Sequence, residues 1–351
     1  MMFSRNDMEI DVNKKLLPTL EDVATEARVS TATVSRCLNE PDKVSKTTRE
    51  RVMAAVEKLH YSPNFGARAI AANRTGTFGA VIPTMDNAIF ARGIEAFQKA
   101  LVARNATMLV ASSDYDPERE AKQIRTLVAR GADGLLLIGF ERDKRIYEFL
   151  KEREIPVVFA WNRSEDKSLS FVGFDNRQAS AKLVKRAIEL GHTSFAYVAA
   201  PVSSNDRARD RLSGARDAIE TAGFDPQEMT LVETEYAIRN GQLAFNRILE
   251  TRNGTSPSLI ICGNDVLAVG VIQAAKQMGL SVPEDLSVVG FDDIELATVV
   301  SPALTTVHVP HREMGRLSAE SLLHQTREPS EPRQVELKTR IVMRESLGPG
   351  K

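Results

Sequence analysis

The segment ARVSTATVSRCLN, residues 27–39, decides the fold of the N-terminal region. Val34 and Leu38 have the spacing of an inward helix face, but most of the other positions carry Ser, Thr or Arg. Serine and threonine form helices poorly, because their hydroxyls compete for backbone hydrogen bonds. Solvated helices usually carry Glu, Lys and Gln instead. The composition therefore indicates a helix whose outward face binds something other than water.

Two further helices flank this segment. The apolar residues that recur at i, i+3, i+4 and i+7 are Leu20, Val23, Ala24 and Ala27 before it, and Val52, Ala55, Val56 and Leu59 after it. Thr19 is placed to cap the first helix, and Thr47 and Glu50 have the spacing of a capping box for the third. With a tight turn at Val29, these patterns predict a three-helix unit over residues 19–62.

A helix–turn–helix motif would account for the composition of the outward face of the second helix. That face consists of Thr31, Ala32, Ser35, Arg36 and Asn39. It is small and rich in donors, so it fits the major groove of DNA, where hydroxyls reach phosphates and arginine reads guanine edges. The alternative is an ordinary solvated helix after an unremarkable turn. The scarcity of Glu, Lys and Gln favours DNA binding.

Composition sets broad limits on the protein class. A chain of 351 residues is expected to form two or three compact units. Its net charge is −1; residues 1–78 hold 12 Lys and Arg against 10 Asp and Glu, and the remainder 34 against 37, so charge alone does not indicate nucleic acid. Cys37 and Cys262 lie far apart and suggest neither a disulfide framework nor a zinc site. The N-terminal residues lack the apolar run of a signal peptide, and no apolar run is long enough to span a bilayer. We therefore expect a cytoplasmic protein without metal or cofactor.

From Phe78 onward, strand and helix signals alternate in two series. The first contains TFGAVIP, ATMLVAS, GLLLIG and IPVVFA, and the second contains FVGFD, FAYVAA, SLIICG and LSVVGFD. Such repeats are typical of doubly wound parallel sheets covered by helices on both faces. The predicted fold is thus an all-α helix–turn–helix headpiece followed by an α/β core of two lobes. Polar residues follow several strands, where open sheets bind ligands: Asn162, Asp175, Asn264 and Asp292.

The segment SPNFGARAIAANRTGT joins the two regions. A single helical turn could run from Asn64 to Ala72, but it has no core of its own and is marginal in isolation. We expect the following divisions: a disordered leader (1–18), the headpiece (19–62), a hinge helix or linker (63–76), the core (77–344) and a tail (345–351). Within the core we expect an N-lobe of about 77–174 and 305–332, and a C-lobe of about 175–304 and 333–344.

From Thr19 to about Arg344 the chain resembles the LacI/GalR family of bacterial transcription repressors. The headpiece stretch TLEDVATEARVSTATVSRCLNEPDKVSKTTRERV carries the most specific part of the resemblance. It continues through VGFDN, RLSGARDAI, GNDVLAVGVIQAAKQMGLSVPEDLSVVGFDDIELA and PALTTVHVP. The core is also similar to periplasmic sugar-binding proteins, which carry a signal peptide and no headpiece. The headpiece therefore favours the repressor branch.

The resemblance implies roles in DNA binding. Base edges would be read by Thr31, Ala32 and Arg36. Phosphates would be contacted at Ser30, Thr33, Ser35, Asn39, Ser45 and Thr48. The stretch PNFGARAIA resembles the hinge helix, which places Asn64, Ala67 and Arg68 in the minor groove. Ile70 stands where the family usually inserts Leu between base pairs; isoleucine is as apolar but stiffer, and packing within the hinge is the alternative.

The resemblance also implies an effector site between the lobes. Its residues would be Phe90, Trp161, Asn205, Arg207, Arg211, Tyr236, Asn264 and Asp292. Phe90 and Tyr236 would lie against a ring, and the polar residues would bind hydroxyls, carboxylates or ring nitrogens. Trp161 stands where many relatives have Asp, so it either stacks on the ligand or fills the lobe interface. Arg211 and Asp292 also suit a mutual salt bridge.

These features together imply a homodimeric transcriptional regulator, expected to be a repressor. It would bind near-palindromic operator DNA and respond allosterically to a sugar, sugar acid or nucleoside, which shifts the lobes and hence the hinge helices. The C-terminal IVMRESLGPGK has no heptad tail, so we expect dimers. The alternative is an α/β ligand-binding protein or enzyme with a vestigial headpiece. The sequence has no GxSxG, phosphate-loop or dinucleotide motif, which argues against an enzyme.

Overall fold

The computed structural model describes residues 17–62, 74–86, 88–327 and 331–350. It divides into two compact units, Met1–Thr75 and Gly76–Lys351, which we describe separately. No helix in these described ranges combines the length and the apolar character that crossing a membrane requires.

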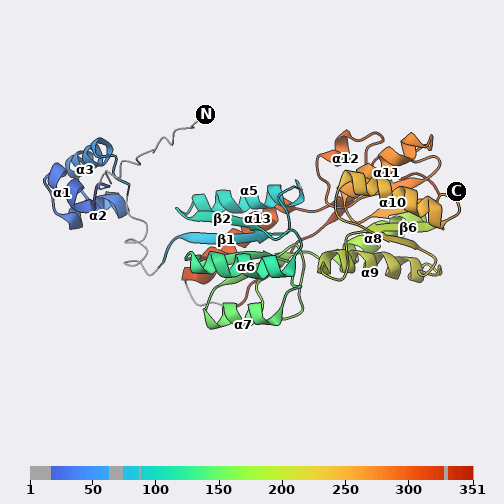
Figure 1. The fold of residues 1–351 in the computed structure, drawn as a ribbon, viewed down its shortest axis with the longest axis horizontal. Coiled ribbons are helices and arrows are strands. Elements are labelled where there is room, and N and C mark those ends of the chain that lie inside the picture. The colour runs from blue at the N-terminus through green and yellow to red at the C-terminus, as the bar shows by residue number, and fades with distance from the viewer. Residues whose placement is uncertain (1–16, 63–73, 87, 328–330, 351) are drawn as a thin grey trace, which may run out of the picture. The chain divides into compact units, whose positions relative to one another are not determined.

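The first unit contains the three helices that the sequence predicts (Figure 1). Their bounds are α1 (Leu20–Ala27), α2 (Thr31–Asn39) and α3 (Lys46–Lys58), with a short 3₁₀ turn η1 (Pro41–Lys43). Thr19 caps α1 in a capping box: the Asp22 amide donates to Thr19 Oγ1 (3.2 Å), and the Thr19 amide donates to Asp22 Oδ2 (2.7 Å). The helix ends at Arg28, whose φ of 53° turns the chain toward α2. This geometry produces the tight turn of the helix–turn–helix.

The core of this unit is small and joins all three helices. It consists of Val23, Ala24, Ala27, Val34, Cys37, Val52 and Ala55. We expected Val34 and Leu38 to be the inward residues of α2. Val34 is buried, but the second buried residue is Cys37, and Leu38 is only half-buried. The predicted capping box of Thr47 and Glu50 is wrong. The cap of α3 is Ser45, whose Oγ accepts from the Thr48 amide (3.4 Å), so the helix begins earlier than expected.

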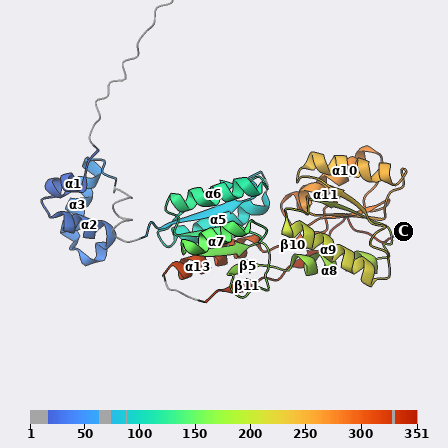
Figure 2. The ribbon, with the colours of Figure 1, turned by 60° about the horizontal axis from the view of Figure 1, so that its bottom comes forward.

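The first lobe of the second unit is a six-stranded sheet between two layers of helices (Figures 1 and 2). In sheet order its strands are β11 (Gln334–Glu336), β5 (Phe171–Gly173), β4 (Val157–Ala160), β3 (Gly134–Ile138), β1 (Thr77–Ile82) and β2 (Thr107–Ser112), and all pairs are parallel. Helices α5 (Ala88–Val102) and α13 (His311–Arg327) cover one face, where Phe97 and Met314 enter the core. Helices α6 (Pro117–Ala129) and α7 (Lys144–Glu152) cover the other through Ile124 and Ile146.

The second lobe repeats this plan with four parallel strands. Their order is β7 (Thr230–Glu233), β6 (Phe195–Ala199), β8 (Leu259–Cys262) and β9 (Ser287–Val289). Helices α8 (Asn176–Glu189) and α9 (Asp206–Thr221) pack on one face, and α10 (Ile238–Thr251) and α11 (Asp265–Gln277) on the other. A short helix, α12 (Leu296–Val299), and an antiparallel pair, β10 (Thr306–His308) with β12 (Arg340–Val342), complete the unit. The two-lobe core with parallel sheets is thereby confirmed.

The C-terminal segments are distributed between the lobes differently from our expectation. Strand β11 pairs with β5 in the first lobe, whereas we expected residues 333–344 in the second (Figure 2). Residues 305–308 instead lie with the second lobe, because Thr306 Oγ1 donates to Asp265 Oδ1 (2.5 Å). The expected tail is also packed: Ser346 is fully buried and its hydroxyl donates to the Val288 carbonyl (2.6 Å). The chain thus crosses between the lobes three times.

Candidate nucleic-acid interface and ligand cleft

Helix α2 presents the three residues that we expect to read bases. Thr31, Ala32 and Arg36 are all exposed, while Val34 and Cys37 of the same helix fill the core. Within the described ranges, the Arg36 guanidinium has no hydrogen-bonded or ionic partner. An unpaired arginine on an exposed helix can form the bidentate pair with guanine that base reading requires. The geometry therefore leaves this face available to DNA.

The residues expected at phosphates are hydrogen-bonded in local pairs. Ser30 caps α2 and lies 2.9 Å from Thr33 across their hydroxyls. The Ser45 hydroxyl donates to Thr48 Oγ1 (2.9 Å) at the start of α3, and Asn39 Nδ2 donates to Ser35 Oγ (3.3 Å). Each hydroxyl keeps spare hydrogen-bonding capacity, and backbone amides at helix N-termini favour phosphate. The hinge residues Asn64, Ala67, Arg68 and Ile70 lie outside the described residues.

In the second unit, a pocket of about 420 Å³ opens between the two lobes. Its lining is Thr84, Asp86, Asp114 and Tyr115 from the first lobe and Ala200, Pro201, Ser204, Asn205, Glu235 and Tyr236 from the second. Asn205 and Tyr236 belong to the predicted effector site. The Tyr115 and Tyr236 rings contact each other across the lobes, with centroids 6.0 Å apart. Arg207 lines a small adjoining hollow together with Tyr115 and Ser204.

The strand-end residues Asn264 and Asp292 do not line this pocket, although the charge of Asp292 acts on both of its tyrosines. Both strand-end residues are fully buried. Arg211 Nη1 donates to the carbonyl of Gly263, the residue before Asn264 (2.7 Å), and Arg211 Nη2 lies 3.4 Å from Asp292 Oδ1. Asp292 Oδ2 and Asn264 Nδ2 have no hydrogen-bond partner in the described structure. An unpaired buried polar atom is costly, so these two atoms are candidates for contact with a ligand.

The electrostatics of the site depend on burial. Burial raises the pKa of Asp292 to about 6, although the nearby charge of Arg211 opposes the shift. The guanidinium of Arg211 stacks on the Phe291 ring at 3.8 Å from its centroid. Burial also raises the pKa of both Tyr115 and Tyr236, and each ring feels the charges of Asp292, Arg207 and Arg211. The two tyrosine side chains and the buried carboxylate of Asp292 are therefore close enough to interact electrostatically.

A second polar network joins the lobes beside the pocket. Arg207 Nη1 donates to Asp206 Oδ1 (2.6 Å), and the Phe140 amide of the first lobe donates to Asp206 Oδ2 (2.7 Å). Burial alone would raise the pKa of Asp206, but Arg207 and the hydrogen bonds hold it below its usual value. A Cβ on Gly139, whose φ is 67°, would lie 2.0 Å from Arg207 Nη1. Only glycine permits this approach of the two lobes.

Phe90 and Trp161 pack together at the lobe interface. Their rings meet edge to face at 5.4 Å, Trp161 is 1% exposed, and neither residue lines the pocket. The indole Nε1 can only donate, so its 3.2 Å hydrogen bond makes His311 Nδ1 the acceptor. His311 Nε2 then donates to the Asp292 carbonyl (3.2 Å). Burial lowers the pKa of His311 to about 3, which keeps the ring neutral for this relay. The structure thus supports interface packing for Trp161.

Sequence reasoning missed most of the residues that line the pocket, Tyr115 among them, and it also missed Asp206 in the network beside it. Tyr115 follows the end of β2, and the polar residues in SDYD could have identified it by the rule applied to the other strand ends. Asp206 adjoins the predicted Asn205, but only the fold shows that it bonds the first lobe. No group of three or more His, Cys, Asp or Glu suited to a metal occurs among the described residues.

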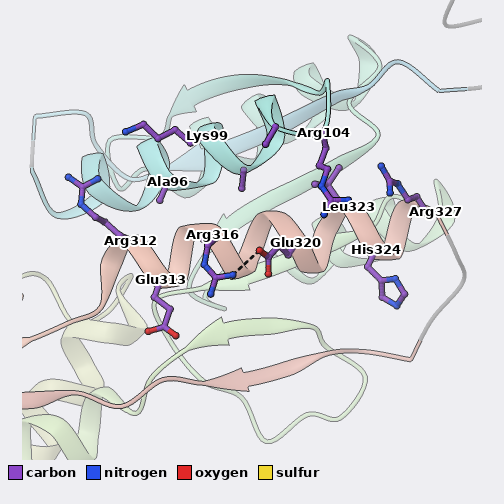
Figure 3. A pocket seen from close by; sticks show the side chains of 12 residues that line it. Ala96, Lys99, Arg104, Arg312, Glu313, Arg316, Glu320, Leu323, His324 and Arg327 are labelled. Atoms are coloured by element: carbon purple, nitrogen blue, oxygen red, sulfur yellow. Dashed lines mark hydrogen bonds and ion pairs between the residues drawn. The ribbon is translucent and has the colours of Figure 1, made fainter. Parts of the chain in front are cut away.

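A larger pocket of about 960 Å³ lies between α5 and α13 on the first lobe (Figure 3). It contains none of the predicted site residues. Arg316 pairs with Glu320 (2.7 Å), and Arg312 pairs with Glu95 (2.5 Å), so much of its charge is already matched. Among the described residues, none that lines this pocket has a buried polar atom without a partner.

Comparison with known proteins agrees with both parts of the chain. Residues 19–64 match the family model described as bacterial regulatory proteins, lacI family, and residues 184–347 match a periplasmic binding protein-like domain. The HTH-type transcriptional repressor PurR of Klebsiella pneumoniae (strain 342) is 32% identical over 338 residues, which is 95% of this chain and 98% of the relative.

Solved structures show the same likeness. A LacI-family transcriptional regulator from Silicibacter pomeroyi aligns with a TM-score of 0.84 and 25% identity, covering 94% of this chain and 99% of that one. The lac repressor dimer bound to operator and the anti-inducer ONPF aligns with a TM-score of 0.83, 27% identity and the same coverage.

Proposed function

Since this chain belongs to the lacI family of bacterial regulatory proteins and is a DNA-binding regulator of transcription, we propose that it is a cytoplasmic repressor controlled by a small effector. The effector binds the cleft between the two lobes of the core. It changes the balance between lobe arrangements and thereby the affinity for operator DNA. Such coupling is reciprocal, so operator DNA changes effector affinity by the same factor.

The observation that carries this proposal is a pair of buried atoms without partners, Asp292 Oδ2 and Asn264 Nδ2; neither residue lines the pocket, but the charge of Asp292 acts on its two tyrosines. A carboxylate oxygen accepts and an amide nitrogen donates, so the pair suits a ligand that has both a donor and an acceptor. Native structures pair the great majority of buried polar groups, so a ligand that bonds these two atoms would supply their partners. Asn205 and Tyr236, which line the pocket, complete the contact set.

For DNA binding we propose that Thr31, Ala32 and Arg36 read base edges. The N-termini of α2 and α3, which Ser30 and Ser45 cap, contact phosphates. Further phosphate contacts come from Thr33, Ser35, Asn39 and Thr48. Two headpieces are needed for a near-palindromic operator, so the active species is a homodimer. The lac repressor, a relative of similar structure, is a dimer on its operator. The hinge assignments at Asn64, Ala67, Arg68 and Ile70 stay proposals from the sequence.

Catalysis is not part of the proposed function. Asp265, the other fully buried carboxylate near the cleft, has both oxygens bonded: Thr306 Oγ1 donates to Oδ1 (2.5 Å) and the Ile294 amide to Oδ2 (2.8 Å). Burial raises the pKa of the Cys262 thiol, which leaves it a poor nucleophile at neutral pH. Turnover of any bound ligand that Asp292→Ala abolishes would revive the enzymatic alternative.

The test is selection of genomic fragments by the full-length protein, followed by titration of the enriched fragment. We expect binding that is far tighter than to random DNA at moderate salt and that Arg36→Ala weakens. Glu152→Gln serves as the control, because Glu152 is an exposed residue at the end of α7 and belongs neither to the α2 face nor to the cleft. Equal affinity for enriched and random DNA at moderate salt would refute the proposal.

A further inference from the structure

We infer that the cleft selects an effector without negative charge, a neutral or amine-bearing sugar or nucleoside, held against an aromatic wall of Tyr115 and Tyr236. This inference rests on the proposed function, because it specifies the ligand chemistry of the same effector site. It predicts that sugar acids and phosphorylated ligands do not bind, although the residue types of the site alone would allow them.

The first observation is the charge of the pocket lining. Among the residues around the pocket of about 420 Å³, three are carboxylates, Asp86, Asp114 and Glu235, and none is Lys, Arg or His. Asp114 is paired with Arg119. In the described part of the chain, the carboxylates of Asp86 and Glu235 have no ion-pair partner. An anion that enters this mouth meets like charge from both lobes, and like-charge contacts reject ligands effectively.

The second observation is that the cleft arginines are already occupied by protein acceptors. Arg207 pairs with Asp206. Arg211 donates to Asn176 Oδ1 (2.8 Å), to the Gly263 carbonyl (2.7 Å) and toward Asp292 (3.4 Å). An anionic ligand would have to break these bonds inside a buried network, which leaves other polar groups unpaired. The two cations therefore orient protein groups and do not form an anion site.

The third observation concerns the aromatic wall. Tyr115 comes from the loop after β2 and Tyr236 from the loop after β7, and their rings contact each other at an interplanar angle of 59°. Asp114 and Tyr115 are consecutive non-glycine residues with left-handed backbone, φ 52° and 60°. The Ser112 hydroxyl donates to Asp114 Oδ1 (2.8 Å), which helps to hold this turn. Strained residues that are tied in this way are typical of ligand-binding positions.

The wall and the unpaired atoms define the shape of the ligand. A ring face lies against Tyr115 and Tyr236, as sugars and bases do on aromatic side chains. Asp292 and Asn264 are fully buried and do not line the pocket, so a ligand that reaches them would donate a hydroxyl or N–H to Asp292 Oδ2 and accept from Asn264 Nδ2 through an oxygen or ring nitrogen. A neutral sugar, a nucleoside or an amino sugar meets both demands. Replacing one hydroxyl by a carboxylate or phosphate adds only repulsion.

The experiment measures binding of matched ligand pairs to the full-length protein by calorimetry and thermal shift. The pairs are galactose with galacturonate, glucosamine with glucosamine 6-phosphate, and adenosine with adenosine 5′-monophosphate. We expect at least one neutral or amine member to bind about tenfold or more tightly than its acidic partner. The double variant Asp86→Asn with Glu235→Gln should reduce the ratio of the two dissociation constants by about threefold or more. The exposed control Glu152→Gln should leave this ratio unchanged.

Tyr115 is tested with the same ligand. Tyr115→Ala should weaken its binding by about tenfold, while Tyr115→Phe, which keeps the ring, should retain it. The inference is overturned if an acidic member binds as tightly as its neutral partner, if no member binds at concentrations up to about 10 mM, or if Tyr115→Ala binds normally. Titration of the enriched DNA fragment without ligand tests the proposed function separately. Failure of DNA binding with the charge preference intact would reject only that function.

Discussion

Replacing Asp292 by Asn should make the core more stable at neutral pH relative to the wild type, and more so as the pH rises. Burial raises the pKa of Asp292 from 3.8 to about 6 in the folded state. Because the folded state then holds the proton more tightly than the unfolded state, stability is lost as the pH rises through that interval. A shift of about two pKa units corresponds to about 3 kcal/mol in all, of which about 1.4 kcal/mol is lost between pH 5 and pH 7.5.

The assay is urea unfolding of wild type and Asp292→Asn at pH 5, 6 and 7.5, followed by the fluorescence of Trp161, the single tryptophan. The new amide leaves its own Nδ2 without a partner, but that cost does not change with pH. The slope of the difference between the two proteins therefore isolates the carboxylate.

Asp293→Asn is the matched control, because the pKa of Asp293 is shifted in the opposite direction from that of Asp292. Burial raises the pKa of Asp293, but hydrogen bonds from Arg344 and His308 hold it below its usual value. The contribution of this residue is thus fully present above the ordinary carboxyl pKa of 3.8 and is lost only in more acidic solution, so its removal should destabilise the core by an amount that stays nearly constant from pH 5 to pH 7.5. A stability difference between wild type and Asp292→Asn that stays constant from pH 5 to 7.5 would refute the reasoning that Asp292 is a buried, incompletely paired carboxylate.

Other predictions address the DNA-binding face and the lobe interface. Arg36→Ala should relax base preference at one position of each half-site and cost about 1–3 kcal/mol per bidentate contact, whereas Ser35→Ala should weaken all sequences alike; selection and sequencing of bound DNA compares them. Equal changes in preference would contradict the assignment. Gly93→Ala should lower the melting temperature, because its Cβ would lie 2.5 Å from the Trp161 ring, and overpacking costs about 1–3 kcal/mol. Effector binding should shift Trp161 emission through His311, and an unchanged spectrum at saturation would count against the relay.

The parts of the fold that sequence predicts well are those with local causes. Helix α1 follows from its apolar spacing and from the Thr19 cap, both within one short segment. Most strands of the two sheets are short apolar runs, which can be recognised without their partners; β7 is an exception that the sequence analysis did not single out. Strand β11 has no such signal: it has three partly exposed residues, and its pairing with β5 depends on a segment far upstream. Its position in the first lobe could not be predicted, because it is a consequence of the tertiary structure.

The same distinction applies to the site. Residue types at strand ends pointed to Asn264 and Asp292, because parallel sheets gather their ligands there. What the sequence could not indicate is which atoms remain unpaired, since this depends on the geometry around Arg211. Trp161 illustrates the limit: its identity allowed both stacking on a ligand and packing, and only its burial against Phe90 favours packing.

The position of Asp292 gives the cleft a direct connection to the first lobe. Its side chain faces the second-lobe network, while its carbonyl accepts from His311, the first residue of α13. His311 in turn fixes the indole of Trp161, whose ring fills the space that Gly93 leaves on α5. A ligand that bonds Asp292 Oδ2 therefore acts on a residue whose backbone is tied to the two helices covering one face of the first lobe. Because Asp292 has a φ of 108°, a conformation rare for a residue with a Cβ, a change in its side-chain bonding can release backbone strain. We expect effector binding to bias the lobe arrangement through this connection rather than through the residues that line the pocket.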